Sequence, residues 1–232
     1  MKVLAIVPAF NEGANIHRLA ELFSNIKNVD VIVINDCSTD NTSEMCRDFG
    51  FNVIDLPSNL GIGGAVQTGY KYAEKHGYDI AIQVDGDGQH NPLYIQSLID
   101  PLIKGEADLI IGSRYLEKAG FQSSFMRRIG INYFSRLIYF LQKKKITDPT
   151  SGFRACNRRV ITLFSNRYPS DYPEPESIVY LLRNNYSIKE VPVVMNEREG
   201  GESSINFIRS IYYMIKVSLA IIIDNLRKIG LT

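Results

Sequence analysis

Two aspartates one residue apart are the sharpest chemical signal in this sequence. Asp85 and Asp87 stand in the segment VDGDGQH, residues 84–90, directly after an apolar stretch. Alternate side chains of an extended segment point the same way, so the two carboxylates can converge. A hard divalent cation such as Mg²⁺ or Mn²⁺ takes oxygen ligands from one or two carboxylates and from substrate phosphates. The pair therefore predicts a metal site that stabilises a departing diphosphate.

An isolated Asp-x-Asp is more often an acidic turn, because Asp and Gly are common turn residues. The preceding strand and the neighbouring motifs favour the metal site here. Gln89 and His90 follow at once and are candidates for a further ligand or an orienting contact. For His90 alone, a surface histidine that only forms hydrogen bonds is an equal alternative.

Carboxylates also follow the first two predicted strands. Glu12 closes the segment 8–12 and Asp36 opens the segment 36–40. A carboxylate at a strand end can accept hydrogen bonds from a ribose or a base N–H, so both are candidate nucleotide-binding residues. Either could instead be a helix N-cap, and Ser38 or Asp40 is expected to be one.

A glycine-rich segment, residues 59–64, leads into a predicted helix. Asn59 and Gly61 begin it, and its backbone can approach a phosphate or a sugar at the positive end of the helix. Because it follows the third strand rather than the first, it does not predict a Rossmann dinucleotide site.

These segments need a sheet to bring them together. The β-branched runs predict strands at residues 3–7, 31–35, 52–55, 80–84 and 109–111, with helical periodicity at 16–26 and 65–73. Such alternation predicts an α/β fold with a mainly parallel sheet flanked by helices. Ligands of open α/β sheets bind at the carboxyl ends of the strands, where the polar segments lie.

The second half is less regular. It predicts helices at 128–142, 158–164 and 176–184, a strand at 188–194, and an amphipathic C-terminal helix at 205–223 that Arg209 and Lys216 interrupt. That helix is too charged to span a membrane alone, so we expect it to lie on a membrane surface or dock on a partner, with a core-facing helix as the alternative. We expect a catalytic domain at 1–204 and this helix at 205–232.

Composition excludes several classes of protein. With 232 residues and 45 % hydrophobic content, the chain suits one large domain. The 26 basic and 25 acidic residues give a net charge of +1, so no nucleic-acid partner is expected. Cys37, Cys46 and Cys156 lack metal-site spacing and fit a reducing compartment, and the short apolar N-terminus is a buried strand rather than a signal peptide.

Taken in chain order, four motifs resemble family 2 glycosyltransferases of the GT-A fold. They are PAFNE at 8–12, NDCSTD at 35–40, NLG at 59–61 and DGDGQH at 85–90. Four further segments are similar to the polyprenyl-phosphate sugar synthases of the dolichyl-phosphate mannose synthase type: GSRY at 112–115, DPTSGFR at 148–154, EVPV at 190–193, and Arg198 with GESS at 201–204. The resemblance covers nearly the whole chain.

The resemblance implies a role for each matching residue. It implies that the nucleotide is held by four residues, namely Pro8, Phe10, Glu12 and Asp36. It implies that Asp85, Asp87 and Gln89 hold the metal. Arg114 and a basic residue of the pair Arg127 and Arg128 would face the acceptor phosphate, and Arg198 would help to hold the donor diphosphate. Arginine forks suit phosphate oxygens, although any one of them alone is more often a solvated surface residue.

The nature of the acceptor decides whether a catalytic base is needed. A phosphate monoester is already nucleophilic at neutral pH, because its second pKa is about 6. A sugar hydroxyl needs a base, for which Asp171, Glu174 or Glu176 stands in the right region of the chain. The basic, apolar segment 127–145 and the C-terminal helix favour a lipid phosphate, although each could be a core helix with basic ends.

The expected function is an inverting transfer of one hexose or N-acetylhexosamine, from UDP by preference, to polyprenyl phosphate in cell-envelope glycan synthesis. Asp87, Arg114 and Glu176 are the candidate catalytic residues. The alternatives are transfer to a saccharide hydroxyl, and a nucleotidyltransferase or sugar-nucleotide binding module. We expect a peripheral protein at the cytoplasmic face of a membrane. Short members of the branch it resembles use a small membrane protein as anchor.

Overall fold

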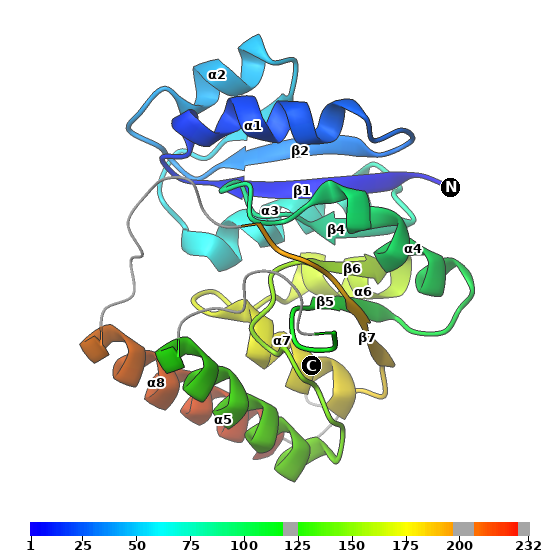
Figure 1. Cartoon of the computed structure of the whole chain (residues 1–232), viewed down its shortest axis with the longest axis vertical. Coiled ribbons are helices and arrows are strands. Elements are labelled where there is room, and N and C mark those ends of the chain that lie inside the picture. Colours follow the sequence, from blue (N-terminus) through cyan, green and yellow to red (C-terminus); the bar gives the residue numbers. More distant parts are fainter. Residues whose placement is uncertain (118–124, 197–206, 227–232) are drawn as a thin grey trace.

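A seven-stranded sheet forms the centre of the computed structural model, which describes residues 1–117, 125–196 and 207–226 (Figure 1). The strand order is β3-β2-β1-β4-β6-β5-β7. The strands are β1 Val3–Ala9, β2 Asp30–Asn35, β3 Asn52–Asp55, β4 Ile80–Gln83, β5 Leu109–Ser113, β6 Arg154–Asn157 and β7 Ile188–Pro192. The expectation of a mainly parallel sheet is confirmed.

One strand runs against the others. β1 pairs in parallel with β2 and β4, β2 with β3, and β5 with β7, whereas β6 is antiparallel to both β4 and β5. Arg154, the first residue of β6, therefore lies opposite Gln83 and Ile111, at the edge where the parallel strands end. The sequence patterns did not predict β6.

Helices cover both faces of the sheet. They are α1 Gly13–Ser24, α2 Thr42–Asp48, α3 Gly61–Lys75, α4 Ile95–Ile103, α5 Phe125–Gln142, α6 Arg158–Asn166, α7 Pro173–Arg183 and α8 Phe207–Leu226. Ile16 of α1 and Leu98 of α4 are buried in the cluster on one face. Tyr70 of α3, Phe164 of α6 and Ile178 of α7 are buried in the cluster on the other.

Helices α5 and α8 run side by side at the margin of the fold (Figure 1). The Tyr133 hydroxyl lies 2.9 Å from Ser218 Oγ, and Gln142 Nε2 donates to Asn225 Oδ1 at 2.6 Å. Val217 and Ile221 of α8 are fully buried, so its inner face belongs to the core, as the alternative interpretation held. In the described ranges of the chain, no helix combines the length and apolarity needed to cross a bilayer.

Candidate active site

Hydrogen bonds join the loops that follow β1 and β2. Asn11 N donates to Ser38 Oγ at 2.9 Å, and Thr39 N donates to Asn11 Oδ1 at 2.9 Å. Asn11 and Cys37 adopt positive φ angles of 55° and 60°, which turn each loop sharply. The predicted nucleotide-binding segments 8–12 and 36–40 are therefore one connected structure. Ser38 serves as a link between the loops.

Asp40 bonds the first amides of two helices. Its Oδ2 accepts from Gly13 N at 3.1 Å and its Oδ1 accepts from Thr42 N at 3.0 Å. Burial raises the pKa of Asp40, but the hydrogen bonds from Thr42 and Gly13 outweigh it and leave the pKa below its usual value. Glu12 precedes α1 but makes no side-chain cap there. Its Oε2 accepts from Asn15 Nδ2 at 2.5 Å.

Asp36 connects β2 to the start of α3. The residue is 3 % exposed, its Oδ1 accepts from Leu60 N at 2.7 Å, and its carbonyl accepts from Asn59 Nδ2 at 3.2 Å. Gly61, at φ +74°, donates its amide to Asn59 Oδ1 at 3.1 Å, and Gly63 donates to Ser170 O at 3.0 Å. The first amides of α3 thus bond within the protein, and donor binding by Asn59 and Gly61 stays a prediction.

The loop after β4 lies against the loop after β1. A Cβ built on Gly86 would lie 3.1 Å from the Pro8 carbonyl and 3.6 Å from Glu12 Cγ. The Phe10 side chain is 48 % exposed, which leaves its ring accessible to a base. Pro8 and Glu12 therefore lie against the loop that carries Asp85, and the contact of Pro8, Phe10 and Glu12 with a nucleotide stays a prediction.

Both oxygens of Asp85 have a neighbour that orients them. Gln83 Nε2 donates to Asp85 Oδ1 at 3.4 Å, and His90 Nε2 lies 3.5 Å from Asp85 Oδ2. His90 Nδ1 accepts the Asp85 amide at 2.9 Å, so the ring proton belongs on Nε2, facing the carboxylate. His90 is 3 % exposed and stacks on Phe153 with ring centroids 4.9 Å apart. The surface-histidine alternative for His90 is therefore wrong.

Asp87 and Gln89 belong to the same turn. Asp87 Oδ1 accepts from Gln89 N at 3.0 Å, and Asn196 N donates to Gln89 O at 2.9 Å, which ties the turn to the segment after β7. In the part of the chain that the structure describes, no three His, Cys, Asp or Glu side chains form a metal-binding group. Two carboxylates and an amide still fit a hard cation that takes its remaining oxygens from water and substrate phosphates.

Arg114 and Asp148 form a buried bidentate pair beside this site. Arg114 Nε and Nη2 donate to Asp148 Oδ2 and Oδ1, both at 2.7 Å, and Asp148 is fully buried. Glu190 accepts the amides of Thr147 and Asp148 at 2.8 and 2.9 Å. Burial lowers the pKa of Arg114, but the hydrogen bond and charge of Asp148, with smaller contributions from Tyr115 and Asp85, outweigh it and raise the pKa. The contact of Arg114 with an acceptor phosphate stays a prediction.

The other predicted basic residues lie on or beyond α5. Arg127 and Arg128 are exposed in the first turn of the helix. The charge of Arg127 acts on Tyr213 of α8. Arg198 lies outside the described residues, as do positions 201–204 and the expected domain boundary at 204. Their roles remain predictions.

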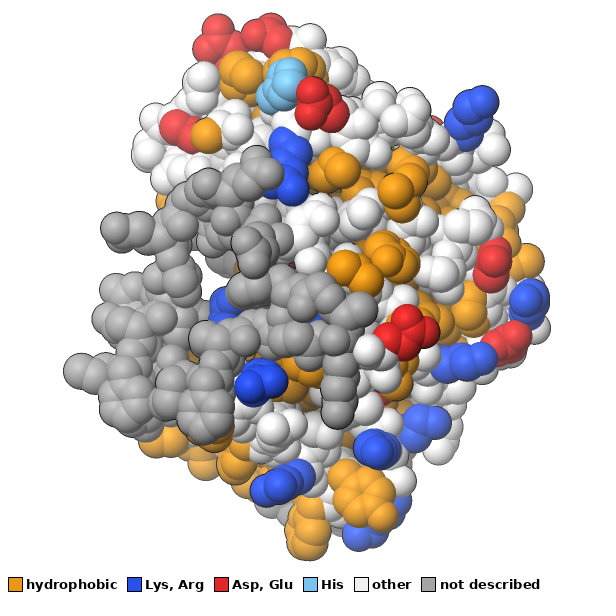
Figure 2. All heavy atoms as spheres, viewed as in Figure 1, with side chains coloured by type: hydrophobic (Ala, Val, Ile, Leu, Met, Phe, Trp, Pro, Cys, Tyr) orange, Lys and Arg blue, Asp and Glu red, His pale blue; other side chains and the backbone are white. Residues whose placement is uncertain are grey.

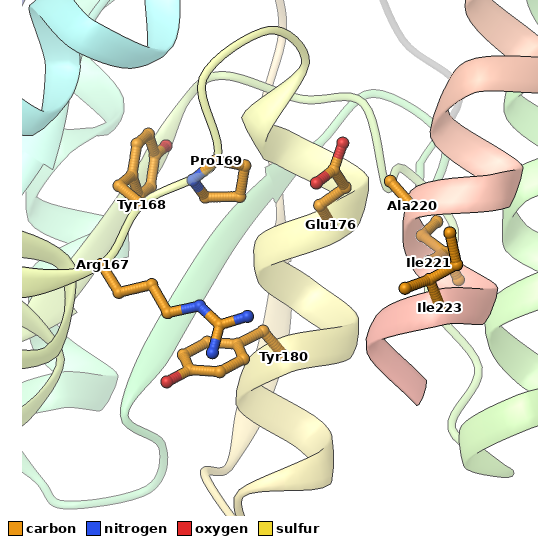
Figure 3. Close-up of a pocket in the computed structure, with 8 residues that line it drawn as sticks. All are labelled: Arg167, Tyr168, Pro169, Glu176, Tyr180, Ala220, Ile221 and Ile223. Carbon is orange, nitrogen blue, oxygen red and sulfur yellow. The ribbon is translucent and has the colours of Figure 1, made fainter. Parts of the chain in front are cut away.

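The structure separates the three candidate bases. Asp171 forms an ion pair with Lys216 of α8. Glu176 lines a cavity of about 230 Å³ between α7 and α8, together with Tyr180, Ile221 and the Arg167 side chain that stacks on Tyr180 (Figure 3). Of the three, Glu174 is the one on which the charge of Asp85 acts: burial raises the pKa of Glu174, the charge of Arg154 opposes the rise, and Asp85 adds to it.

Gln83 and Arg154 are the site residues that sequence reasoning missed. Both are fully buried at the strand edge, and neither had a chemical pattern of its own. Arg154 did belong to the segment DPTSGFR at 148–154, but no sequence pattern indicated that this segment lies close to the segment after β4.

Comparison with known families decides the membership of this chain. Residues 4–164 match the family described as Glycosyl transferase family 2. The chain belongs to this glycosyltransferase family. The resemblance stated from the motifs is confirmed, and the matched segment contains every described site residue up to Arg154.

Similar proteins of this family carry polyprenyl-phosphate names. The chain is 28 % identical over 211 residues to the UDP-N-acetylglucosamine–dolichyl-phosphate N-acetylglucosaminyltransferase of Methanococcus voltae, covering 82 % of this chain and 84 % of that protein. It is 28 % identical over 225 residues to the polyprenol monophosphomannose synthase of Mycolicibacterium smegmatis, covering 88 % and 81 %.

A solved structure supports the fold. The glucosyl-3-phosphoglycerate synthase of Mycobacterium tuberculosis, in complex with Mn²⁺, UDP and phosphoglyceric acid, aligns with a TM-score of 0.75 at 20 % identity. The alignment covers 99 % of this chain and 80 % of that one. At this identity the similarity concerns the fold alone.

Proposed function

We propose that this glycosyltransferase moves one sugar from a nucleoside diphosphate sugar to polyprenyl phosphate, with inversion at the anomeric carbon. One observation carries the acceptor: two of the three candidate bases are held elsewhere. Asp171 is ion-paired with Lys216, and Glu176 lines the cavity between α7 and α8, which leaves Glu174 as the candidate that the charge of Asp85 reaches. A phosphate acceptor needs no base, since its oxygen is already nucleophilic at neutral pH.

The donor nucleotide would lie over the joined loops of β1 and β2. Phe10 would pack on the base, while Glu12 and Asp36 accept hydrogen bonds from the ribose or the base. Asp85 and Asp87, with Gln89, would hold a divalent cation, Mg²⁺ or Mn²⁺, which neutralises charge on the departing diphosphate. A uridine diphosphate hexose or N-acetylhexosamine is the favoured donor, and the name of the Methanococcus voltae relative supports it.

The acceptor phosphate would meet Arg114 first. Asp148 holds this guanidinium through two parallel hydrogen bonds, so its plane is fixed before substrate binds. Arg127 and Arg128, exposed at the start of α5, would guide the phosphate from the membrane surface. Arg198 would contribute on the donor side.

The outer face of α5 and α8 fits a membrane surface, which supports the proposal of a peripheral enzyme of cell-envelope glycan synthesis at the cytoplasmic face. Phe140 is 72 % exposed, Tyr212 60 % and Ile215 57 %. Residues 125–145 contain no acidic residue, and Lys143, Lys144 and Lys145 follow α5. Figure 2 shows basic side chains beside exposed hydrophobic ones at the lower end of the molecule, where α5 ends in Figure 1. Such faces bind anionic interfaces.

We also propose that residues 1–204 form the catalytic domain and that 205–232 dock on lipid or on a small membrane protein. Membrane fractionation in cells that lack each candidate anchor protein tests this part. Equal recovery in the membrane fraction under every deletion leaves lipid as the sole anchor.

The decisive experiment supplies purified protein with polyprenyl phosphate, a panel of radiolabelled nucleotide sugars, and Mg²⁺, Mn²⁺ or EDTA. Metal-dependent label in the organic phase that mild acid releases is the expected result. Label that appears only on an oligosaccharide acceptor would contradict the proposed acceptor and return Asp171, Glu174 and Glu176 as candidate bases.

A further inference from the structure

Glu190 of β7 holds the segment that precedes β6 through three hydrogen bonds. β7 is the last strand of the sheet, and Glu190 lies opposite Ile111, two residues before the end of β5 (Figure 1). Its Oε2 accepts from Thr147 N at 2.8 Å, and its Oε1 accepts from Thr147 Oγ1 and from Asp148 N, both at 2.9 Å. An ionised carboxylate only accepts hydrogen bonds and does so at both oxygens, so this one group satisfies all three donors.

The same segment holds the side chain of Arg114. Asp148 is fully buried, and its Oδ2 and Oδ1 accept from Arg114 Nε and Nη2, both at 2.7 Å. Its Oδ2 also accepts from the Arg114 amide at 3.2 Å. Because the amide of Asp148 is bonded to Glu190, the direction of the guanidinium follows from where Glu190 holds this segment. The Arg114 side chain is still 12 % exposed, which leaves it within reach of a ligand.

A chain of hydroxyl groups also connects Glu190 to the backbone on both sides of Arg114. Thr147 Oγ1 gives its proton to Glu190, so Ser113 Oγ is the donor in the 2.7 Å bond between the Ser113 and Thr147 hydroxyls. Ser113 Oγ in turn accepts from the Tyr115 amide at 3.2 Å. Both the backbone and the side chain of Arg114 are therefore held by groups that bond to Glu190 directly or through one hydroxyl.

We propose that Glu190 is a positioning residue for the acceptor phosphate: through Thr147 and Asp148 it holds the Arg114 fork in the direction that binds this anion. The inference rests on the proposed function, in which Arg114 meets the acceptor phosphate, and it extends that site to the edge strand of the sheet. A fork that is fixed in advance loses less conformational freedom when the phosphate binds. The inference also gives a role to the first residue of the segment EVPV at 190–193.

Steady-state kinetics with polyprenyl phosphate in detergent micelles test this role. Glu190→Gln keeps the shape of the side chain but puts an NH₂ group in place of one accepting oxygen, so at least one of the three donors loses its acceptor. We expect KM for polyprenyl phosphate to rise about 10- to 100-fold and KM for the nucleotide sugar to stay within about twofold of the wild type. Glu106→Gln is the matched control and should change neither KM, because Glu106 pairs on the surface with Lys189, the neighbour of Glu190 in β7.

A second pair of variants changes only the hydroxyl of Thr147. Thr147→Val replaces the hydroxyl by a methyl group and removes the donor to Glu190, whereas Thr147→Ser keeps that donor. We expect KM for polyprenyl phosphate to rise in Thr147→Val and to stay near the wild-type value in Thr147→Ser. Equal KM values in the two variants would contradict the role of this hydrogen bond.

A double-mutant cycle shows whether Glu190 acts through Arg114. Arg114→Lys keeps the positive charge but has no planar fork for Asp148 to orient. Adding Glu190→Gln to Arg114→Lys should therefore raise KM for polyprenyl phosphate by less than about twofold more. Effects that multiply in the double variant would overturn the proposed route through Arg114.

Two further outcomes separate this inference from the proposed function. A wild-type KM for polyprenyl phosphate in Glu190→Gln, or equal rises in KM for both substrates, overturns the positioning role and leaves the proposed function standing. A wild-type enzyme that transfers sugar to an oligosaccharide and not to polyprenyl phosphate overturns the proposed function, and the role of Glu190 with it.

Discussion

The two halves of the sheet hold their strand ends in different ways. In the half formed by β3, β2, β1 and β4, backbone amides bond short polar side chains, as in Asn11 with Ser38 and Asp36 with Leu60. In the half formed by β6, β5 and β7, buried ionic groups hold the strand ends, as in Arg114 with Asp148 and in the buried Arg154. The hydrogen-bonded loops of the first half suit a nucleotide, and the buried arginines of the second half suit an anionic acceptor.

The boundary between the halves is where the chemistry is proposed. Asp85 follows the last strand of the first half, and its charge acts on the pKa of Arg114 and of Glu174 in the second. The strongest test of the contrast between the two halves therefore removes charge at this boundary.

Asp87→Asn should reduce sugar transfer by at least about a thousandfold, or about 4 kcal/mol, because the metal would lose a charged ligand. The measurement is initial rate against Mn²⁺ concentration, with the unfolding temperature as a check on folding. Asp55→Asn, which removes a carboxylate from a surface pair with Arg47 in the same half, is the matched control. Full activity of the wild type in excess EDTA would end the metal interpretation.

A second prediction concerns the joint between the halves. A Cβ built on Gly63 of α3 would lie 2.1 Å from Pro169 O and 2.2 Å from Ser170 O, which are backbone atoms of the second half. Gly63→Ala should therefore lower the free energy of unfolding by about 1 to 3 kcal/mol, measured by urea denaturation. At Gly130 of α5 a Cβ meets nothing within 4 Å, so Gly130→Ala should be neutral or stabilising. Equal effects of the two changes would mean that the halves do not pack rigidly at α3.

The sequence predicted the first half of the fold better than the second. Buried parallel strands are nearly continuous runs of β-branched residues, so residues 3–7, 31–35 and 80–84 were recognisable, and the structure extends or trims them by one or two positions. β6 was not predicted from the sequence because Arg154 begins it and only Ala155 and Cys156 are apolar. The helices α2 and α4 were missed as well, the first because it is polar and the second because Pro101 stands inside it.

The same contrast holds for the site. The rule that ligands meet the ends of parallel strands predicted the region of Asp85, Glu12 and Asp36 from sequence alone. The pairing of Gln83 with Arg154 joins two distant segments across antiparallel strands, and no local pattern encodes it. The family resemblance predicted a role for Arg114, whereas the structure shows how Asp148 orients it.

A smaller effect is expected at the proposed membrane face of the second half. Replacing Lys143, Lys144 and Lys145 by Gln removes up to about 1 kcal/mol of attraction for each lysine near an anionic surface. Sedimentation with vesicles of phosphatidylglycerol and phosphatidylcholine should show weaker binding by the triple variant than by the wild type. Added salt should remove this difference by weakening the binding of the wild type. A triple change of Lys2, Lys27 and Lys75, which belong to the other half, is the control. Equal loss in both triple variants would show a general charge effect rather than a docking face.

The smallest expected effect contrasts two carboxylates of the second half by pH. Burial raises the pKa of Asp108, before β5, but hydrogen bonds from Ser187 and Asn157 and the charge of Arg159 outweigh it and hold the pKa below its usual value. The contribution of Asp108 to stability is therefore present above its pKa in the unfolded state, about 3.9. It is lost as the pH falls through the lower pKa of the folded state. Asp108→Asn should cost about 1 kcal/mol at pH 7, and the difference from wild type should close in acid.

Glu190, at the functional edge, should show the opposite sign. Burial raises its pKa more than the hydrogen bonds from Thr147 and Asp148 lower it. A raised folded pKa means that its contribution is present below the unfolded value, about 4.3, and is lost as pH rises through the folded value. Urea denaturation from pH 3 to 8 should therefore show how the free energy of unfolding changes. As the pH rises, the wild type should become more stable relative to Asp108→Asn and less stable relative to Glu190→Gln. Parallel curves for the two variants would mean that the buried carboxylate of Glu190 is as well compensated as the hydrogen-bonded carboxylate of Asp108.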